Sequence, residues 1–314
     1  MIEGQADGIR RRRVLVLGGT GTIGRATVKV LLARGHDVVC LVRSRPNTGG
    51  RTQGPTVNDD LAGATLRFAD VTDPASLARD GIRGEAFDVL LSCLASRTGA
   101  PDDAWRIDHA AHMGALEQAM EARIPHMIQL SAICVQKPVL ALQHAKLAFE
   151  ESLIASGIDY TIVRPTAFFK SLSGQVERVR RGKSFLVFGD GTLTACKPIS
   201  DRDLGAFLAD CIDNPDRRNR ILPIGGPGPA ITPRMQGERL FALCGRKPRF
   251  TQVPVALLDS VVLALSLLAR ILPWLRGKAE LAGIQVDVLD TPGINSLVPT
   301  SEDEEIGRAS CRER

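Results

Sequence analysis

The strongest constraint on the fold is an apolar run near the start of the chain that ends in closely spaced glycines. Val14–Leu17 are four consecutive apolar residues, which is typical of a buried parallel strand. Glycines follow at positions 18, 21 and 24, and residues 25–35 have the pattern of a helix that a glycine ends. Such a turn lets a pyrophosphate approach the backbone closely at a helix N-terminus. The residues expected to bind a dinucleotide here are Gly18, Thr20, Gly21, Thr22, Ile23 and Gly24.

The segments that follow alternate in the same way. We expect further strands at residues 37–43, 65–70, 88–95, 126–131 and 160–165. Helical patterns lie between several of them, notably at residues 104–122 and 141–156. Strands that alternate with helices predict an α/β fold, a doubly wound parallel sheet of the Rossmann type. The ligand is then expected at the carboxyl edge of the strands.

Residues at that edge indicate which dinucleotide is bound. An acidic residue at the end of the second strand would bind the ribose 2′-hydroxyl of NAD, but this chain has Arg43 there. A guanidinium suits a 2′-phosphate, so NADPH is the expected cofactor. Asp70 after the third strand is a candidate for the adenine amine, and Leu94 and Ala95 for the nicotinamide ribose. Pro165, at the end of the sixth strand, completes the expected cofactor site.

The expected catalytic residues follow the short-chain dehydrogenase/reductase pattern, with one exception. Ser131 ends the fifth strand and Lys146 lies on the next helix, but Leu142 occupies the position of the usual tyrosine. The only tyrosine, Tyr160, is on the sixth strand. Ketone reduction normally uses a phenol as proton donor, so its absence disfavours that reaction. Reduction of a carbon–carbon double bond stays possible where the substrate delocalises the charge, with Lys146 holding the cofactor ribose.

Composition excludes other classes of function. With one Tyr and two Trp among 314 residues, the chain shows no base-stacking pattern, and nucleic acid is not an expected partner. The seven cysteines and the scattered histidines have no metal-ligand spacing, so no metal is expected. Polar and charged residues fill positions 3–13 in place of a signal peptide, which predicts a cytoplasmic protein, or a chloroplast one if a targeting segment has been removed. The mild net charge of +5 allows transient contact with a membrane, and the oligomeric state stays open.

The alternation stops after residue 165. Short apolar pieces interrupted by Gly and Pro, such as residues 188–191 and 222–228, predict a smaller C-terminal substrate lobe. We therefore expect an NADP-binding Rossmann domain at 1–165, a substrate lobe at 166–282 and an atypical, poorly ordered tail at 283–314. Residues 257–275 are the most apolar stretch, but they include charged residues, which favours a buried or interfacial helix over a membrane span.

Several longer motifs carry a resemblance to one family. These are residues 91–97, 131–138, 164–171, 188–191, 195–200 and 222–228. In this order they resemble the NADPH-dependent 8-vinyl-reductases of (bacterio)chlorophyll synthesis, an atypical, NmrA-like branch of the short-chain dehydrogenase/reductases. The resemblance covers about residues 13–282 and implies reduction of the 8-vinyl group of a divinyl (proto)chlorophyllide to ethyl. It further implies a large apolar pigment site, with Phe168, Phe169 and Lys170 as candidate residues and Phe185 and Phe188 nearby.

Two alternatives stay open at this point. A non-catalytic, NmrA-like sensor of NADP(H) would also lack the tyrosine, and so would another carbon–carbon double-bond reductase of the atypical family. In addition, residues from Gly283 onward do not look like the segment with which similar proteins continue. A segment missing from the pigment site would leave NADPH binding intact but weaken pigment reduction.

Overall fold

The computed structural model describes residues 10–43 and 61–257, together with 260, 264 and 267. Its centre is a parallel sheet of seven strands in the order β3-β2-β1-β4-β5-β6-β8. The strands are β1 (Arg13–Leu17), β2 (Asp37–Val42), β3 (Thr65–Phe68), β4 (Val89–Ser92), β5 (His126–Leu130), β6 (Asp159–Pro165) and β8 (Arg220–Ile224). The order reverses between β1 and β4, which is the switch point of a doubly wound sheet. The predicted fold class is thereby confirmed.

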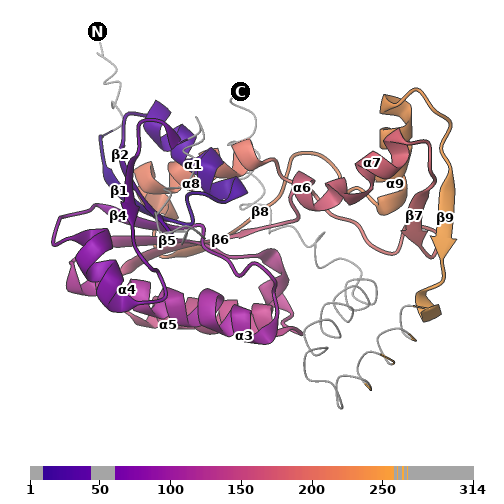
Figure 1. The fold of residues 1–314 in the computed structure, drawn as a ribbon. Helices are drawn as coiled ribbons and strands as arrows, with labels where there is room; N and C mark the ends of the chain where they lie inside the picture. The colour runs from indigo at the N-terminus through magenta and orange to yellow at the C-terminus, as the bar shows by residue number, and fades with distance from the viewer. Residues whose placement is uncertain (1–9, 44–60, 258–259, 261–263, 265–266, 268–314) are drawn as a thin grey trace, which may run out of the picture.

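Both faces of this sheet are buried, which explains its continuous apolar strands. Along β1, Val14 and Val16 belong to the core on one face, while Leu15 and Leu17 belong to the core on the other. Figure 1 shows α1 and α8 on one face of the sheet and α3, α4 and α5 on the other. The bounds of these helices are α1 (Thr22–Ala33), α8 (Asp201–Asp213), α3 (Pro101–Ala104), α4 (His112–Glu121) and α5 (Ala141–Ala155).

The helices differ from the prediction in two places. The first helix begins at Thr22 rather than residue 25, because the glycine turn leads directly into it. The helix expected at 104–122 begins at Pro101 and contains a π-helical segment, η3 (Trp105–Ala111), between α3 and α4. A second π segment, η2 (Leu77–Ile82), follows the short α2 (Pro74–Ser76). Wider π turns change which side chains face the sheet edge.

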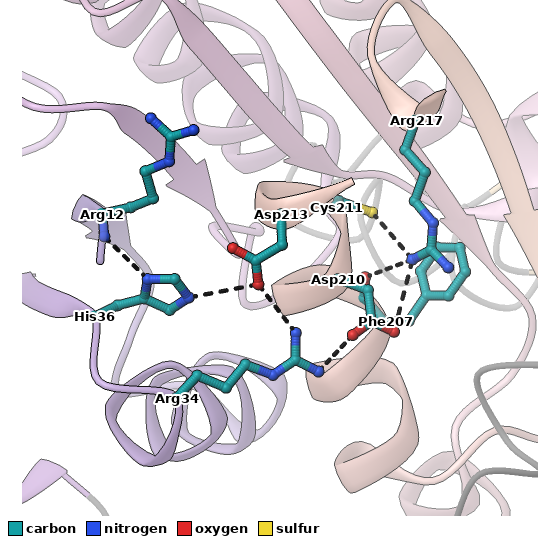
Figure 2. A network of polar contacts seen from close by, with 8 residues as sticks. All are labelled: Arg12, Arg34, His36, Phe207, Asp210, Cys211, Asp213 and Arg217. Atoms are coloured by element: carbon teal, nitrogen blue, oxygen red, sulfur yellow. Dashed lines mark hydrogen bonds and ion pairs between the residues drawn. The ribbon is translucent and has the colours of Figure 1, made fainter. Parts of the chain in front are cut away.

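Polar contacts fasten α1 to α8 on the side away from the glycine turn (Figure 2). Arg34 at the end of α1 forms ion pairs with Asp210 and with Asp213, the latter at 3.4 Å. The buried ring of His36 accepts a hydrogen bond from the Arg12 amide at 3.2 Å and lies 3.6 Å from the Asp213 carboxylate. Burial lowers the pKa of His36 from its usual value. These contacts hold the two helices in one fixed packing.

The seventh strand corrects the predicted division of the chain. Residues 222–228 were expected to build the substrate lobe, but Leu222–Ile224 lie in β8, which pairs with β6 in parallel register. The prediction is wrong there because Gly and Pro residues occur at the end of a strand as well as in a loop. The helix α8 also belongs to the sheet domain, since Leu204, Phe207 and Leu208 are buried in its core.

A smaller lobe lies beside the sheet, at the right of Figure 1. It comprises α6 (Phe169–Leu172), η5 (Ser173–Gln175), α7 (Val176–Arg180), β7 (Phe185–Phe188), α9 (Pro233–Leu243) and β9 (Phe250–Val253). The strands β7 and β9 pair in parallel. Their core consists of Val179, Phe185, Val187 and Phe241, with Phe250 packed against them.

Two expectations fall mainly or wholly on residues that are not described. The tail at 283–314 lies outside the described residues, and so does most of the apolar stretch 257–275. Across 10–43 and 61–257, no helix has both the length and the apolar character needed to cross a membrane.

Candidate active site

The glycine turn between β1 and α1 has a backbone that larger residues would disrupt. Gly18 has φ +73°, and a Cβ there would lie 2.6 Å from the carbonyl oxygen of Cys93 on the neighbouring strand end. A Cβ at Gly24 would overlap the Gly18 carbonyl. The Gly21 amide donates to that carbonyl at 2.9 Å, which closes the turn. The first N–H groups of α1 are therefore presented at the sheet edge, where they suit a pyrophosphate.

A cavity of about 570 Å³ opens at this turn. Its lining includes Thr20, Gly21 and Thr22, and it extends along α1 to the beginning of α8. Lysine and arginine side chains dominate the rest of the lining, which consists of Arg25, Ala26, Lys29, Lys170, Asp201 and Arg202. The sign of this charge matches a phosphate-bearing ligand. The side chain of Ile23, by contrast, is buried in the core, so only its backbone faces the turn.

Lys170 connects the smaller lobe to the turn. Its ammonium donates to the Thr22 hydroxyl at 2.6 Å. The two phenylalanines that precede Lys170 lie in different surroundings. Phe168 packs against the sheet core, while Phe169 is 54% exposed. The three consecutive residues predicted for the pigment therefore do not form one surface. Phe185, expected near the pigment residues, belongs to the buried core of the lobe.

Arg43 and Asp70, the residues predicted for the adenosine end of a cofactor, follow two adjacent strands of the sheet. Arg43 is exposed at the end of β2. Asp70 follows β3 and accepts hydrogen bonds from the Thr72 hydroxyl at 2.7 Å and the Thr72 amide at 2.9 Å. These bonds lower the pKa of Asp70, and the positive charges of Arg43 and Arg106 add to the effect. Asp70 and Arg43 therefore lie near each other at one edge of the sheet.

Lys146 is held by a carboxylate that the sequence did not reveal. Its ammonium lies 2.9 Å from Asp108 Oδ1, and both side chains are buried. Asp108 comes from η3, and its other oxygen accepts a hydrogen bond from the Ser96 amide at 3.2 Å, just beyond β4. The pair thus links α5 to the loop that contains Leu94 and Ala95. A lone aspartate within a helical pattern gives no sign of such a role.

A neutral histidine adjoins this pair. The Nδ1 atom of His112 lies 2.9 Å from the Ile107 carbonyl, which can only accept, so Nδ1 is the protonated nitrogen. The Nε2 atom therefore accepts from the Ser92 hydroxyl at 2.8 Å. Burial lowers the pKa of His112, and the positive charge of Lys146 lowers it further. The result is a buried polar cluster at the end of β4.

The other predicted catalytic residue is engaged elsewhere. The Ser131 hydroxyl donates to the buried carboxylate of Glu150, which also pairs with Arg164 through an Nε–Oε2 contact of 3.1 Å. Ser131 is therefore joined to Glu150 and Arg164, and no hydrogen bond between Ser131 and Lys146 occurs in the described part of the chain. Pro165, which ends β6 beside this network, is buried.

No phenol is near Lys146. Leu142 lies one turn before it on α5, next to the loop at Gly99. Tyr160 is the second residue of β6, at the amino end of that strand. Lys146 lies near the carboxyl ends of the strands through Asp108 and the loop after β4, so it and Tyr160 are at opposite ends of the strands. His144 is exposed on α5.

Fold and site together fit a protein that binds a nicotinamide dinucleotide. The chain matches the NAD(P)H-binding family over residues 18–215. A solved structure of UDP-glucose 4-epimerase from Thermus thermophilus in complex with NAD shares the fold, with a TM-score of 0.63 and 19% identity. That similarity covers 77% of this chain and 86% of the epimerase.

Relatives with higher sequence identity show which NAD(P)H-binding family the chain belongs to. The chain is 50% identical to the chloroplastic divinyl chlorophyllide a 8-vinyl-reductase of Zea mays, over 86% of this chain and 69% of the maize protein. It is 49% identical to the protein of the same name from Oryza sativa subsp. indica, over 86% of this chain and 68% of the rice protein. The chain belongs to the divinyl chlorophyllide a 8-vinyl-reductase family.

Proposed function

We propose that this chain reduces the 8-vinyl group of a divinyl (proto)chlorophyllide to ethyl, with NADPH as the cofactor. The observation that carries the proposal is its 50% identity to the maize reductase over most of both chains. The chemistry of the site agrees, because it has a buried lysine but no phenol. The maize relative is named as chloroplastic, which supports a chloroplast as the location, with the cytoplasm of a bacterium as the alternative.

The residues at the sheet edge fit the cofactor. Glycine at position 18 lets the turn pack against the Cys93 backbone, and the N–H groups of α1 that follow the turn would bind the pyrophosphate. Arg43 would bind the 2′-phosphate. When bound, NADPH supplies the hydride. Lys170, already at Thr22, would add a positive charge beside the pyrophosphate, a role different from its predicted place in the pigment site.

Lys146 is proposed to orient the cofactor ribose and to place a positive charge beside the reacting alkene. Asp108 fixes the position of the ammonium, so little rearrangement is needed. The negative charge that would develop when the alkene takes the hydride would be spread over the conjugated macrocycle, so no proton donor at an oxygen is required. A proton from water or a side chain would then complete the ethyl group. Leu142 would then contribute to pigment binding, because it keeps the pocket apolar where a flat pigment would lie. Ser131 is proposed to act through Glu150, as a support for this part of α5.

Two rival functions make different predictions. A non-catalytic, NmrA-like sensor would bind NADPH without oxidising it. Another carbon–carbon double-bond reductase would act on small conjugated substrates. The buried Lys146–Asp108 pair favours neither rival over the vinyl reductase, whereas the identity to the maize protein favours the reductase.

The deciding experiment is incubation of the full chain with NADPH and 3,8-divinyl chlorophyllide. We expect a blue shift of the pigment's Soret band with matching NADPH oxidation. Tight NADPH binding without a shift would support the sensor and contradict the proposal. Oxidation with small enones only would support the second rival.

The choice of NADPH is tested at Arg43. Replacement of Arg43 by Ser removes the guanidinium expected at the 2′-phosphate, so we expect KM for NADPH to rise at least about tenfold. KM for NADH should stay nearly unchanged, because NADH has no 2′-phosphate. The control is Arg220→Ser, another exposed arginine, on the distant β8. An equal effect on both cofactors would contradict the assignment of Arg43.

A further inference from the structure

We propose that the outer end of the smaller lobe is a docking surface for an anionic lipid bilayer. The surface consists of Arg180, Arg181, Lys183, Arg246, Lys247 and Arg249, which we call the basic tip. The inference does not depend on the reductase activity, since it rests on charge and exposure in the lobe alone.

The positive charge of the chain is concentrated in this lobe. Residues 169–193 and 233–253 contain ten Lys and Arg but only three Asp and Glu, whereas the whole chain has a net charge of +5. The rest of the chain therefore carries no net positive charge. Such a separation orients a molecule in the field of a charged surface.

Two adjoining turns bring the charges together. One connects α7 to β7 and the other connects α9 to β9, and the Phe185 amide donates to the Arg249 carbonyl at 2.8 Å between them. The Arg246 guanidinium lies directly against Gly182, which has φ +77°. Paired strands and these contacts thus hold both turns at the same end of the lobe, at the upper right of Figure 1.

Most of these cations have no carboxylate partner. Arg180 and Arg181 share Glu177, at 3.7 and 2.9 Å. Among the described residues, none of the other four members of the basic tip forms an ion pair, and all four are exposed. Unpaired cations on one surface repel each other, and an anionic partner removes that repulsion.

An exposed leucine adjoins the second turn. Leu243, the last residue of α9, is 85% exposed, the largest value for any large apolar side chain in the described ranges. Cationic residues around a protruding apolar side chain are the composition of surfaces that bind bilayers, where headgroups take the charges and the acyl region takes the leucine. Nucleic acid can also bind cations through its phosphates, but proteins that bind single strands add exposed aromatic rings for stacking, and Phe185 and Phe241 here are buried.

The test is flotation of the full chain with lipid vesicles at about 50 mM salt. We expect binding to vesicles with about 30% phosphatidylglycerol, little binding to pure phosphatidylcholine, and release as salt rises to about 0.5 M. The variant K247E/R249E should lose at least about tenfold in partitioning. Leu243→Ser, which changes no charge, should lose about fivefold.

The matched control is R11E/R220E, which changes net charge equally at two exposed arginines outside the lobe. It should bind nearly as the unchanged protein does, and melting curves should show that all variants are folded. Equal binding to neutral vesicles, or an equal loss in the control, would overturn the proposal. So would tight, salt-sensitive binding to an oligonucleotide without binding to vesicles. An unchanged Leu243→Ser variant would overturn the role of the leucine.

Discussion

Lys146 and Asp108 are the residues whose surroundings matter most for the proposed chemistry. Both are buried, and their charged atoms lie 2.9 Å apart. A buried ion pair need not stabilise a protein relative to an apolar pair, but removing one partner leaves a buried charge alone and is costly. The pair therefore fixes the position of the Lys146 ammonium at the sheet edge, although an apolar pair there could give the folded protein equal or greater stability.

Substitutions at the pair test both chemistry and stability, since each removes one of two buried charges. Lys146→Met should lower kcat at least about a hundredfold, because the positive charge beside the alkene is lost. Asp108→Asn should lower the free energy of unfolding by about 3 kcal/mol in urea titrations, since the ammonium loses its counter-charge.

The control for both substitutions is Glu177→Gln, which removes an exposed partner of Arg181 and should change stability by less than about 1 kcal/mol. Retained turnover in the Lys146→Met variant would exclude the lysine from the mechanism.

Sequence patterns predicted some residues of the candidate site and missed others. Lys146 and Leu142 follow from helical spacing, which is local. Asp108 and Glu150 do not, because their partners come from other elements and only packing brings them together. Ser131 illustrates the difference, since its position after β5 was predicted but its contact with Glu150 was not. The Lys170–Thr22 contact joins residues 148 positions apart and likewise depends on tertiary structure.

Among the elements, the packing of α1 on α8 has the most direct effect on the site, because α1 begins at the glycine turn. A Cβ at Gly205 of α8 would lie 2.8 Å from the Ala26 carbonyl carbon and from the Thr27 amide nitrogen. The helices approach this closely only because position 205 has no side chain.

Gly205→Ala should therefore push the helices apart. We expect a loss of about 1–3 kcal/mol in unfolding free energy and a higher Kd for NADPH, measured by fluorescence titration. Gly174→Ala is the matched control, since a Cβ there meets nothing within 4 Å and should change neither quantity. A variant at 205 with unchanged Kd would show that the turn is independent of this packing.

The six expected strands all exist because continuous apolar runs bounded by turns are a strong signal. The seventh was missed because β8 is recognisable only by its partner, β6, some 60 positions earlier in the chain. The π segments were also missed, since the widening of a helical turn has no residue signal of its own in this sequence.

Over the whole molecule, three buried histidines make stability depend on pH. Burial lowers the pKa of His36, His112 and His126 in the folded state, that of His126 to about 4. The unfolded chain therefore binds more protons than the folded chain below about pH 6.5. The stability that the neutral, buried histidines contribute is fully present above that pH. It is lost as the pH falls toward the pKa of each histidine in the folded state.

Unfolding free energy should thus decrease between pH 6 and pH 5, by up to about 1.4 kcal/mol per pH unit for each histidine. His126→Gln should reduce the dependence of unfolding free energy on pH by the contribution of one histidine. Glutamine still offers a donor to the Thr161 hydroxyl, which lies 3.0 Å from the His126 ring. His144→Gln, at an exposed position, should leave the slope unchanged. A slope that stays the same in His126→Gln would contradict the assigned cause.

The late position of β8 has a consequence for biosynthesis. On the ribosome, the edge of β6 stays without its neighbour until residue 224 has emerged, by which time the first half of the smaller lobe has already been made. The nascent chain must therefore carry an unpaired strand edge while residues 166–224 are made. Translation speed and chaperone access between residues 165 and 224 should then decide how much of the newly made protein reaches its native state.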